Sequence, residues 1–262
     1  MNPSSEAPIL SPHDEVTSGR NMITIQGVLY ALESTALPLV TQTVEIADQM
    51  RVRLMGIHKT IAGGPESVSP RFSGKNRQGE PLHGHQHAYI LPFDKNGHGR
   101  IDHVLVVCRG GFNASEQAAL DRLTSLYQRG RDSEIRCVPV KWGNLEDICS
   151  PACRRFVSVT PFVPSRHYRR GRGEFSQWLD AQLRRECRNH GIQEPSHIQT
   201  MHSTRAEGRP FRWIEFRRNR KGDDSMMGFG FEIKFREPVS GPVALGYGAH
   251  FGLGQFRPAE DN

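Results

Sequence analysis

The sequence predicts an α+β protein made of tandem ferredoxin-like (RRM-like) domains with a C-terminal glycine-rich loop. Segments with the apolar spacing of strands and helices occur in the order β-α-β-β-α-β between residues 23 and 148, which is the ferredoxin-like order. A second strand–helix series starts near residue 154. The chain has 262 residues, enough for two domains that each bury a core. We therefore expect a disordered tail over 1–22 and domains over 23–148 and 149–262.

The elements of the first domain follow from local patterns. Residues 23–34 resemble a strand, and residues 41–56 have the apolar periodicity of a helix that ends at Gly56. Residues 59–84 are rich in Gly, Pro and Ser and predict a loop. Residues 85–93 and 100–109 predict a hairpin. Asn113 and Glu116 have capping-box spacing for a helix over 114–128, and residues 134–142 predict the last strand.

The second domain is expected to begin with a strand over 154–163. An arginine-rich turn leads into a helix over 174–190 that Gly191 closes. Strands are predicted near 197–202, 211–218 and 228–236. Residues 241–258 form the glycine-rich loop, with a short strand on either side.

The number of cysteines and the composition of the N-terminus indicate the cellular compartment in which we expect the protein. The first twenty residues are polar and contain no apolar signal-peptide core. The five cysteines are an odd number, which favours reduced thiols and a cytoplasmic protein. Cys149 and Cys153 are spaced C-x3-C without a second pair, so two unrelated thiols are favoured over a zinc site. No cofactor and no metal are expected, and no segment is apolar enough to span a membrane.

Basic residues are unevenly distributed. Residues 154–220 contain fifteen Arg, no Lys and six Asp or Glu, whereas the whole chain carries a net charge of +6. Guanidinium groups match phosphate oxygens and stack on bases, so this stretch favours a nucleic-acid partner over a merely solvated face. The candidate RNA-binding side chains are those of the turn at 165–173 and of a later cluster, namely Arg166, His167, Tyr168, Arg169, Arg170, Arg172, Arg217, Arg218 and Arg220. The alternative for the turn is a disordered basic loop.

A histidine-rich segment is the first candidate for chemistry. His83, His85, His87 and Tyr89 occupy alternate positions, so in a strand they would share one face. Imidazole titrates near neutral pH, which suits general acid–base cleavage of RNA through its 2′-hydroxyl. Two alternatives stay open. One is a metal site completed by Asp94, Asp102 or His103, and the other is a set of structural or RNA-contacting histidines.

Two glycine-containing loops are candidate binding sites. Gly246, Gly248, Gly252 and Gly254 surround His250 in a loop that could lay its backbone amides against RNA. Residues 94–102 resemble the start of a calcium loop, but Leu105 occupies the position where a bidentate Glu is needed. A hairpin turn is therefore favoured there.

Three segments carry a resemblance to a known family. They are SGKNRQGEPLHGHQHAYILPFDKNGHGRIDHVLV, VTPFVPSRHYRRGRG and GPVALGYGAHFGLGQF. They resemble the Cas-six-like half of the fused Cas-five/Cas-six subunit of type I-U (I-G) CRISPR systems, within the RAMP superfamily. The likeness extends over roughly residues 25–258. It implies a protein that cuts precursor CRISPR RNA within the repeat, keeps the guide RNA and joins a type I interference complex.

The resemblance also implies roles for residues. His85 and His87 are the nearest matches to the functional histidine, with His83 and Tyr89 beside them, and Lys75 is a candidate to stabilise the phosphorane. Many members of the superfamily carry the catalytic histidine on the first helix, but the helix predicted over 41–56 contains none. The fused family also has a Cas-five-like half that is not present in this sequence. We therefore expect a split subunit, or a fragment of a longer fusion, with a separate Cas-five-like chain among its partners.

The sequence thus predicts a metal-independent endoribonuclease that leaves 2′,3′-cyclic phosphate and 5′-hydroxyl ends. Two alternatives are a non-catalytic guide-RNA-binding subunit and a metal-dependent hydrolase that uses the H-x-H-x-H strand.

Overall fold

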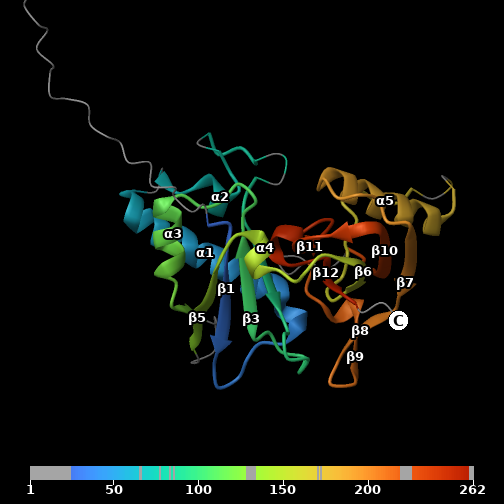
Figure 1. The fold of residues 1–262 in the computed structure, drawn as a ribbon, viewed down its shortest axis with the longest axis horizontal. Coiled ribbons are helices and arrows are strands. Elements are labelled where there is room, and N and C mark those ends of the chain that lie inside the picture. Colours follow the sequence, from blue (N-terminus) through green and yellow to red (C-terminus); the bar gives the residue numbers. More distant parts are fainter. Residues whose placement is uncertain are drawn as a thin grey trace, which may run out of the picture.

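A computed structural model describes residues 25–64, 67–76, 78–82, 84, 86–127, 134–169, 171, 173–218 and 226–259. The expected tail over 1–22 lies outside these residues. Two sheets lie side by side, one built from each half of the chain (Figure 1). None of the helices in the described ranges is both long and apolar enough to cross a membrane.

The first sheet has the ferredoxin-like order that the sequence predicts. Its strands run β2-β3-β1-β5-β4, and every pair is antiparallel. The elements are β1 (Gly27–Glu33), α1 (Thr43–Ala62), β2 (Tyr89–Phe93), β3 (His103–Val107), α3 (Ala114–Asp121), β4 (Ser125–Tyr127) and β5 (Glu134–Gly143). Three short helical segments join them: η1 (Val40–Gln42), α2 (Pro70–Ser73) and α4 (Leu145–Ile148).

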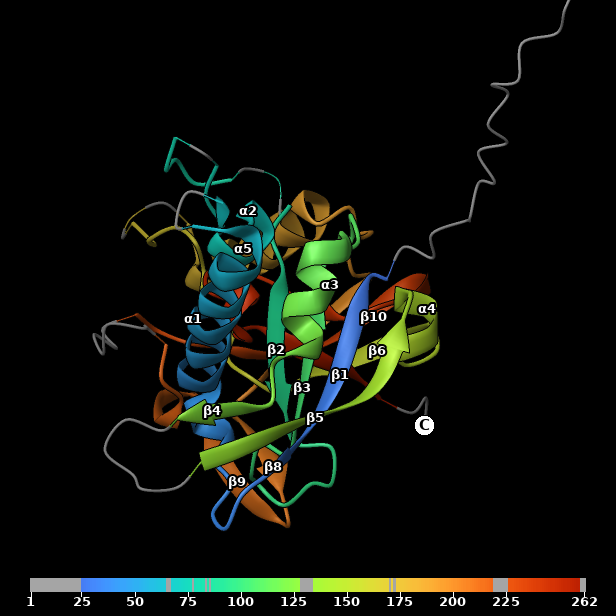
Figure 2. The same cartoon turned by 90° about the vertical axis from the view of Figure 1, so that its left-hand side faces the viewer.

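Both faces of the first sheet are buried. Helices α1 and α3 cover one face (Figure 2), and the core there includes Tyr30, Met50 and Leu120. On the other face Leu91 and Leu105 pack against Ala244 and Ala249 from the end of the chain. Burial on both faces explains why the central strands are almost continuously apolar. It also brings the glycine-rich loop onto the first sheet.

The second sheet repeats the ferredoxin-like order with one replacement. Its strands run β11-β12-β6-β10-β7, and α5 packs on one face. Where the second helix of the fold would lie, between β10 and β12, the chain forms the glycine-rich loop with the single turn η4 (Ala249–Phe251). The other elements are β6 (Cys153–Ser158), α5 (Phe175–Asn189), β7 (His197–Met201), β10 (Gly230–Val239), β11 (Val243–Ala244) and β12 (Gln255–Pro258). The tandem ferredoxin-like class is confirmed, whereas the division into separate domains at residue 148 stays a prediction.

A small hairpin replaces the strand predicted over 211–218. Strands β8 (Ser203–Ala206) and β9 (Arg209–Arg212) pair with each other, and η3 (Trp213–Glu215) follows directly. The carboxylate of Glu215 accepts the backbone N–H of Arg212 at 2.9 Å, which stabilises the turn and ends the strand. Phe211 and Trp213 then pack with Val40 of the first half.

Helix α1 continues past the glycine at which the sequence predicts its end. It runs through Gly56 to Ala62 and closes at Gly63, which has a φ of +83°. His58 therefore lies on the first helix, contrary to the expectation that this helix contains no histidine. The extra turn buries His58, whose side chain is 3% exposed.

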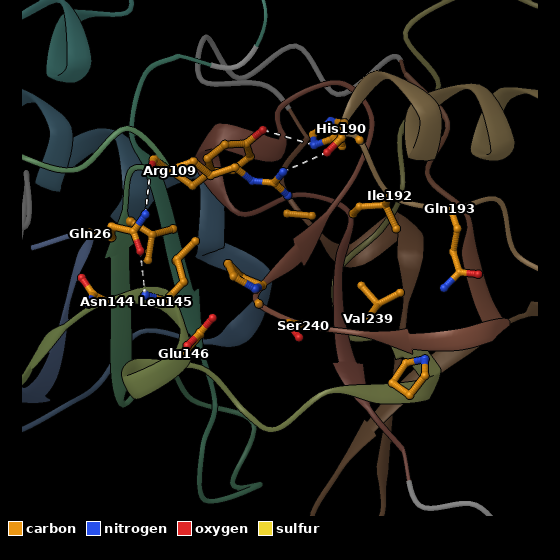
Figure 3. Close-up of a pocket in the computed structure, with 17 residues that line it drawn as sticks. Gln26, Arg109, Asn144, Leu145, Glu146, His190, Ile192, Gln193, Val239 and Ser240 are labelled. Carbon is orange, nitrogen blue, oxygen red and sulfur yellow. Dashed lines mark hydrogen bonds between the residues drawn. The ribbon is translucent and has the colours of Figure 1, made fainter. Parts of the chain in front are cut away.

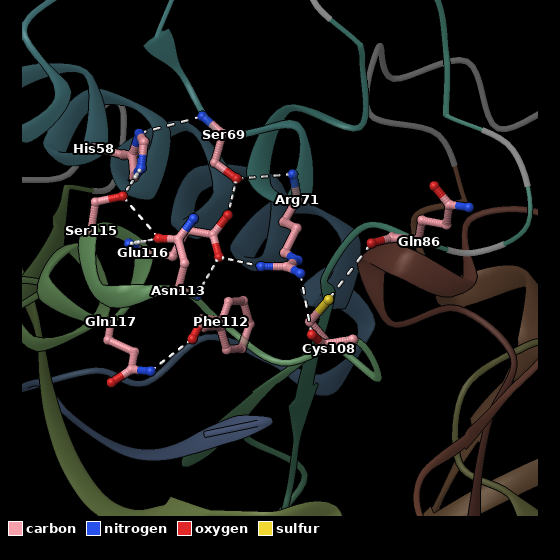
Figure 4. Close-up of polar contacts among 11 residues, drawn as sticks. His58, Ser69, Arg71, Gln86, Cys108, Phe112, Asn113, Ser115, Glu116 and Gln117 are labelled. Atoms are coloured by element: carbon pink, nitrogen blue, oxygen red, sulfur yellow. Dashed lines mark hydrogen bonds and ion pairs between the residues drawn. The ribbon is translucent and has the colours of Figure 1, made fainter. Parts of the chain in front are cut away.

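His58 belongs to a buried polar network that links α1, α2 and α3 (Figure 4). The Ser69 N–H donates to Nδ1 of His58 at 3.3 Å, so the ring proton lies on Nε2, which contacts Oγ of Ser115 at 3.1 Å. Glu116 closes the capping box by accepting the N–H of Asn113 at 2.8 Å, and it pairs with Arg71 at 2.7 Å. Each polar group is thus satisfied with a neutral imidazole.

This network predicts an acid-sensitive contribution to stability. Burial lowers the pKa of His58 below its ordinary value of 6.5, although Glu116 partly opposes this. The unfolded chain therefore binds the proton more tightly, and stability falls as pH drops below about 6.5. His58→Gln can keep the hydrogen bonds without titrating. We expect its melting temperature to fall less between pH 7.5 and 5.5 than that of the wild type.

The control for this prediction is His202→Gln, because His202 is exposed. This variant should keep the pH dependence of the wild type. An unchanged pH dependence in His58→Gln, measured by thermal unfolding, would contradict the assignment.

The calcium-like segment is a hairpin turn, as the sequence favours. The carboxylate of Asp94 accepts the backbone N–H groups of Gly97 at 2.7 Å and Gly99 at 2.6 Å. Asp102 accepts the N–H of Lys95 at 2.8 Å and contacts Nδ1 of His103 at 2.9 Å. Both carboxylates therefore order the loop backbone between β2 and β3.

Candidate functional site

Three polar side chains meet in the cleft between the two sheets. Tyr89 begins β2, Arg109 follows β3, and His190 caps the C-terminus of α5. The Tyr89 hydroxyl lies 3.3 Å from Nδ1 of His190, and Nη1 of Arg109 donates to the His190 carbonyl at 3.0 Å (Figure 3). Gln26 holds the Arg109 backbone by donating to its carbonyl at 2.8 Å. The cluster therefore joins the first half of the chain to the second.

Local sequence explains how His190 reaches this position. Helix α5 ends because Gly191 adopts a φ of +67°, and the amide of His190 bonds back to Glu186 at 3.0 Å. The last carbonyls of a helix carry partial negative charge, so a cation beside them is favoured. Arg109 supplies that cation.

Two cavities meet at this cluster. The larger, about 850 Å³, extends toward Asn144, Ile192 and Ser240 (Figure 3). The smaller, about 560 Å³, extends toward Arg71, Gln86 and Asn189. Tyr89, Arg109 and His190 line both of them.

The glycine-rich loop brings a second imidazole to the same place. His250 of η4 stacks on His87, with ring centroids 3.4 Å apart, and on Tyr89, with centroids 3.8 Å apart. Its Nδ1 contacts the carbonyl of Ala88 at 3.2 Å. Strand β2 begins at Tyr89 and not at residue 85, so His87 precedes the strand, yet His87 and Tyr89 contact the same ring.

Burial fixes the protonation of the phenol. Tyr89 is 8% exposed, and burial raises its pKa above the ordinary value of 10, with Arg109 partly opposing the shift. The hydroxyl therefore stays protonated at neutral pH and acts as a hydrogen-bond donor or acceptor.

Of the other predicted catalytic residues, the structure describes Lys75. His83 and His85 lie outside the described residues, and their neighbours Gly84 and Gln86 line the smaller cavity. Lys75 lies in an exposed turn, where its backbone bonds to the Ser73 hydroxyl at 3.2 Å. The structure does not bring Lys75 into the Tyr89 cluster, and Arg109 is the cation found there.

The arginine-rich turn is partly exposed and partly anchored. Arg166, His167 and Arg169 are exposed, whereas Arg170, Arg172 and Arg220 lie outside the described residues. Tyr168 packs against Phe175 with ring centroids 5.1 Å apart, and its hydroxyl donates to the carbonyl of Gly173 at 2.7 Å. Tyr168 therefore orders the turn, and its role in stacking on a base stays a prediction.

The later arginine cluster is divided between surface and interior. Arg217 is exposed, and its N–H donates to the carbonyl of Thr41 at 2.9 Å. Arg218 is only 7% exposed. An RNA strand on the surface could contact Arg217, but not Arg218 without a rearrangement.

The glycine-rich loop turns most of its amides inward. All four glycines have positive φ, which explains their identity, but the loop does not display its backbone as the sequence predicts. The N–H groups that donate to carbonyls within the protein belong to Tyr247, Ala249, Phe251, Gly252, Leu253 and Gly254. The side chains that this loop offers to the cleft and the surface are His250 and Tyr247, the latter 45% exposed.

Sequence patterns do not reveal Arg109 and His190. Arg109 resembles an ordinary strand end and His190 an ordinary helix end, and they lie 81 residues apart. No spacing pattern links them, because only the packing of the two sheets brings them together.

Among the described residues, no group of three or more His, Cys, Asp or Glu side chains is arranged to bind a metal ion. His83 and His85 are not part of that set. The metal-site hypothesis for the H-x-H-x-H segment therefore stays untested.

Comparison with known proteins gave similarity of fold only. The sequence matches no protein-family model and no curated protein. A structure of Cas6b is 10% identical, with a TM-score of 0.45 over 89% of this chain and 100% of that chain. A RAMP protein that binds different RNA substrates is 15% identical, with a TM-score of 0.44 over 90% and 100%. A Cas6-related protein from Pyrococcus furiosus is 12% identical, with a TM-score of 0.43 over 91% and 100%.

Proposed function

We propose that this protein binds CRISPR repeat RNA and cleaves it without a metal ion, as a RAMP-type endoribonuclease related to the Cas-six-like half of type I-U (I-G) subunits. Three segments of the sequence resemble that family. The observation that carries the proposal is that His87 and His250 stack together beside Tyr89, whose hydroxyl contacts His190. Tyr89, His190 and Arg109 line both cavities between the sheets. Imidazoles beside a fixed cation are the groups that metal-free RNA cleavage needs.

The reaction needs a base, an acid and a cation. One imidazole removes the proton of the 2′-hydroxyl, and the resulting oxygen attacks the adjacent phosphorus. The bond from phosphorus to the 5′-oxygen breaks, and a second imidazole protonates that leaving oxygen. His87 and His85 are our candidates for these two roles, because both belong to the histidine pattern of the sequence and His87 stacks on His250. Arg109, which lines both cavities, would stabilise the negative phosphorane, a role that the resemblance implies for Lys75.

RNA binding would extend beyond the cleft. The exposed Arg166 and Arg169 follow β6 and precede α5, and Arg217 lies near the start of α1. Guanidinium groups at these points would hold phosphates on either side of the cleft. After cleavage the protein would retain the guide RNA and join the other subunits of a type I complex, including a Cas-five-like chain.

A non-catalytic guide-RNA-binding subunit is the second candidate, because His250 and Tyr89 are packed within the protein.

Mapping the product ends separates the two functions from each other and from metal-dependent hydrolysis. The purified protein is incubated with end-labelled repeat RNA, and the fragments are analysed by mass spectrometry. We expect a 5′ fragment that ends in a 2′,3′-cyclic phosphate, lighter by one water than the linear phosphate. Fragments with 3′-hydroxyl and 5′-phosphate ends would indicate attack by water, and binding without fragments would support the non-catalytic subunit.

A further inference from the structure

One face of the second sheet carries an ordered set of basic side chains. Phe156, Ile233 and Ile198 are in register on the face that α5 covers. Because side chains alternate along a strand, the neighbouring positions point to the opposite face, on which Trp213 packs over Gly230 and Met201 at one end. Those positions hold Arg155 and Val157 on β6, Glu232, Lys234 and Arg236 on β10, His197 and Gln199 on β7, and Arg257 on β12.

The basic residues lie in rows across the strands. Arg155, Lys234 and His197 are directly opposite one another on three neighbouring strands. Neighbouring strands are about 4.8 Å apart, so these side chains are close. Lys234, Arg236, Arg257 and His197 are exposed, and Arg155 is half-buried. Arg155 and Lys234, two cations directly opposite each other, repel unless an anion balances them.

One carboxylate compensates this charge only in part. Glu232 accepts a hydrogen bond from Nε of Arg155 at 2.7 Å. That bond, together with the charges of Arg155 and His197, lowers the pKa of Glu232 below its ordinary value. Among the outward residues named above, four are Arg or Lys and one is acidic, so the positive charge exceeds the negative charge. A polyanion would balance the excess.

The same face offers few rings that could read bases. RRM-type sheets stack two or three bases on aromatic side chains, whereas none of the eight outward residues named above is Phe, Tyr or Trp and His197 is the one ring among them. The cations can therefore contact phosphates, which carry no sequence information. A β-sheet surface of this width suits single-stranded RNA, because its flexible backbone can place phosphates beside the rows of basic side chains.

We propose that this basic face of the second sheet, formed by Arg155, Lys234, Arg236, Arg257 and His197, binds the phosphate backbone of single-stranded RNA without regard to sequence. This proposal rests on the proposed function only because it takes RNA as the partner. It adds a holding surface for RNA outside the cleft, separate from the arginine-rich turn and the glycine-rich loop.

The test uses a triple variant, Lys234→Gln, Arg236→Gln and Arg257→Gln. Its affinity for a fluorescent, unstructured single-stranded RNA unrelated to any repeat is measured by anisotropy over a range of salt. We expect at least about a tenfold loss of affinity at low salt. The slope of log K against log salt should become shallower by about 2, because each phosphate contact on a single strand contributes about 0.7.

The matched control is Arg53→Gln, Lys59→Gln and Arg122→Gln, which removes the same charge from exposed positions of the first half. It should keep most of the affinity and the slope. Unchanged binding by the sheet variant, an equal loss in the control, or an equal loss for duplex RNA would overturn the proposal. Cleavage of repeat RNA is scored separately, so a protein that binds here but never cuts would contradict only the proposed function.

Discussion

Replacing His87 by alanine is expected to slow cleavage of repeat RNA by at least ~100-fold, the usual scale for a general acid or base. His87 stacks on His250 and is the member of the H-x-H-x-H pattern that lies within the described residues. RNA affinity should persist, because phosphate contacts by exposed arginines do not depend on this ring. Single-turnover rates and binding constants, measured on the same preparation, separate the two effects.

His85→Ala should show a loss of similar size if the two imidazoles act as acid and base. His202→Ala is the control, because His202 is exposed between β7 and β8 and should keep the wild-type rate. Thermal unfolding of each variant shows whether a loss of rate reflects a loss of fold. Full activity in both His85→Ala and His87→Ala would remove the catalytic assignment.

Gly254→Ala is expected to destabilise the fold more than an added methyl group at any other glycine of the glycine-rich loop. Gly254 has a φ of +59°, and a Cβ built on it would lie 1.9 Å from the backbone oxygen of Leu245. The obstructing atom is backbone, so the loop itself must move. We expect a loss of about 3–5 kcal/mol, from the left-handed conformation and the overlap together. The melting temperature should fall by about 10 °C.

Gly241→Ala provides the matched control, because it has a φ of +84° but no heavy atom within 4 Å of the new Cβ. It should cost only the backbone strain, about 1–2 kcal/mol. Equal melting temperatures for Gly254→Ala and Gly241→Ala would show that the loop is not packed as described. The comparison therefore distinguishes two roles for these glycines. They either allow close packing, as the inward amides indicate, or expose the backbone to RNA.

The order of the elements could be predicted from the sequence, whereas several ends could not. Gly56 is a plausible end for α1, but an exposed glycine within a helix costs only about 1 kcal/mol relative to Ala, and burying His58 in the extra turn offsets this. The helix predicted over 114–128 stops at Asp121, because Leu126 pairs with Ile135 in the strand β4. The periodicity of residues 114–128 does not reveal this pairing of β4 with β5.

The candidate site was predictable only in part. His87 and Tyr89 stand out by their spacing, and His250 stands out within its loop. Arg109 and His190 come from opposite halves of the chain, and only the packing of the two sheets joins them. The arginine-rich stretch predicts a class of partner, but it does not show that burial separates Arg218 from the exposed Arg217.

In the proposed reaction, the 2′-hydroxyl of the RNA attacks the adjacent phosphorus, and the protein supplies acid–base catalysis. The most direct measurement compares repeat RNA with the same RNA carrying hydrogen in place of the 2′-hydroxyl at the mapped cut, both in excess EDTA. Our account predicts that the wild-type protein cuts the first RNA and leaves the second intact, although it binds both. Cutting of the deoxy-substituted RNA, or cutting that appears only when a divalent metal is added, would contradict it.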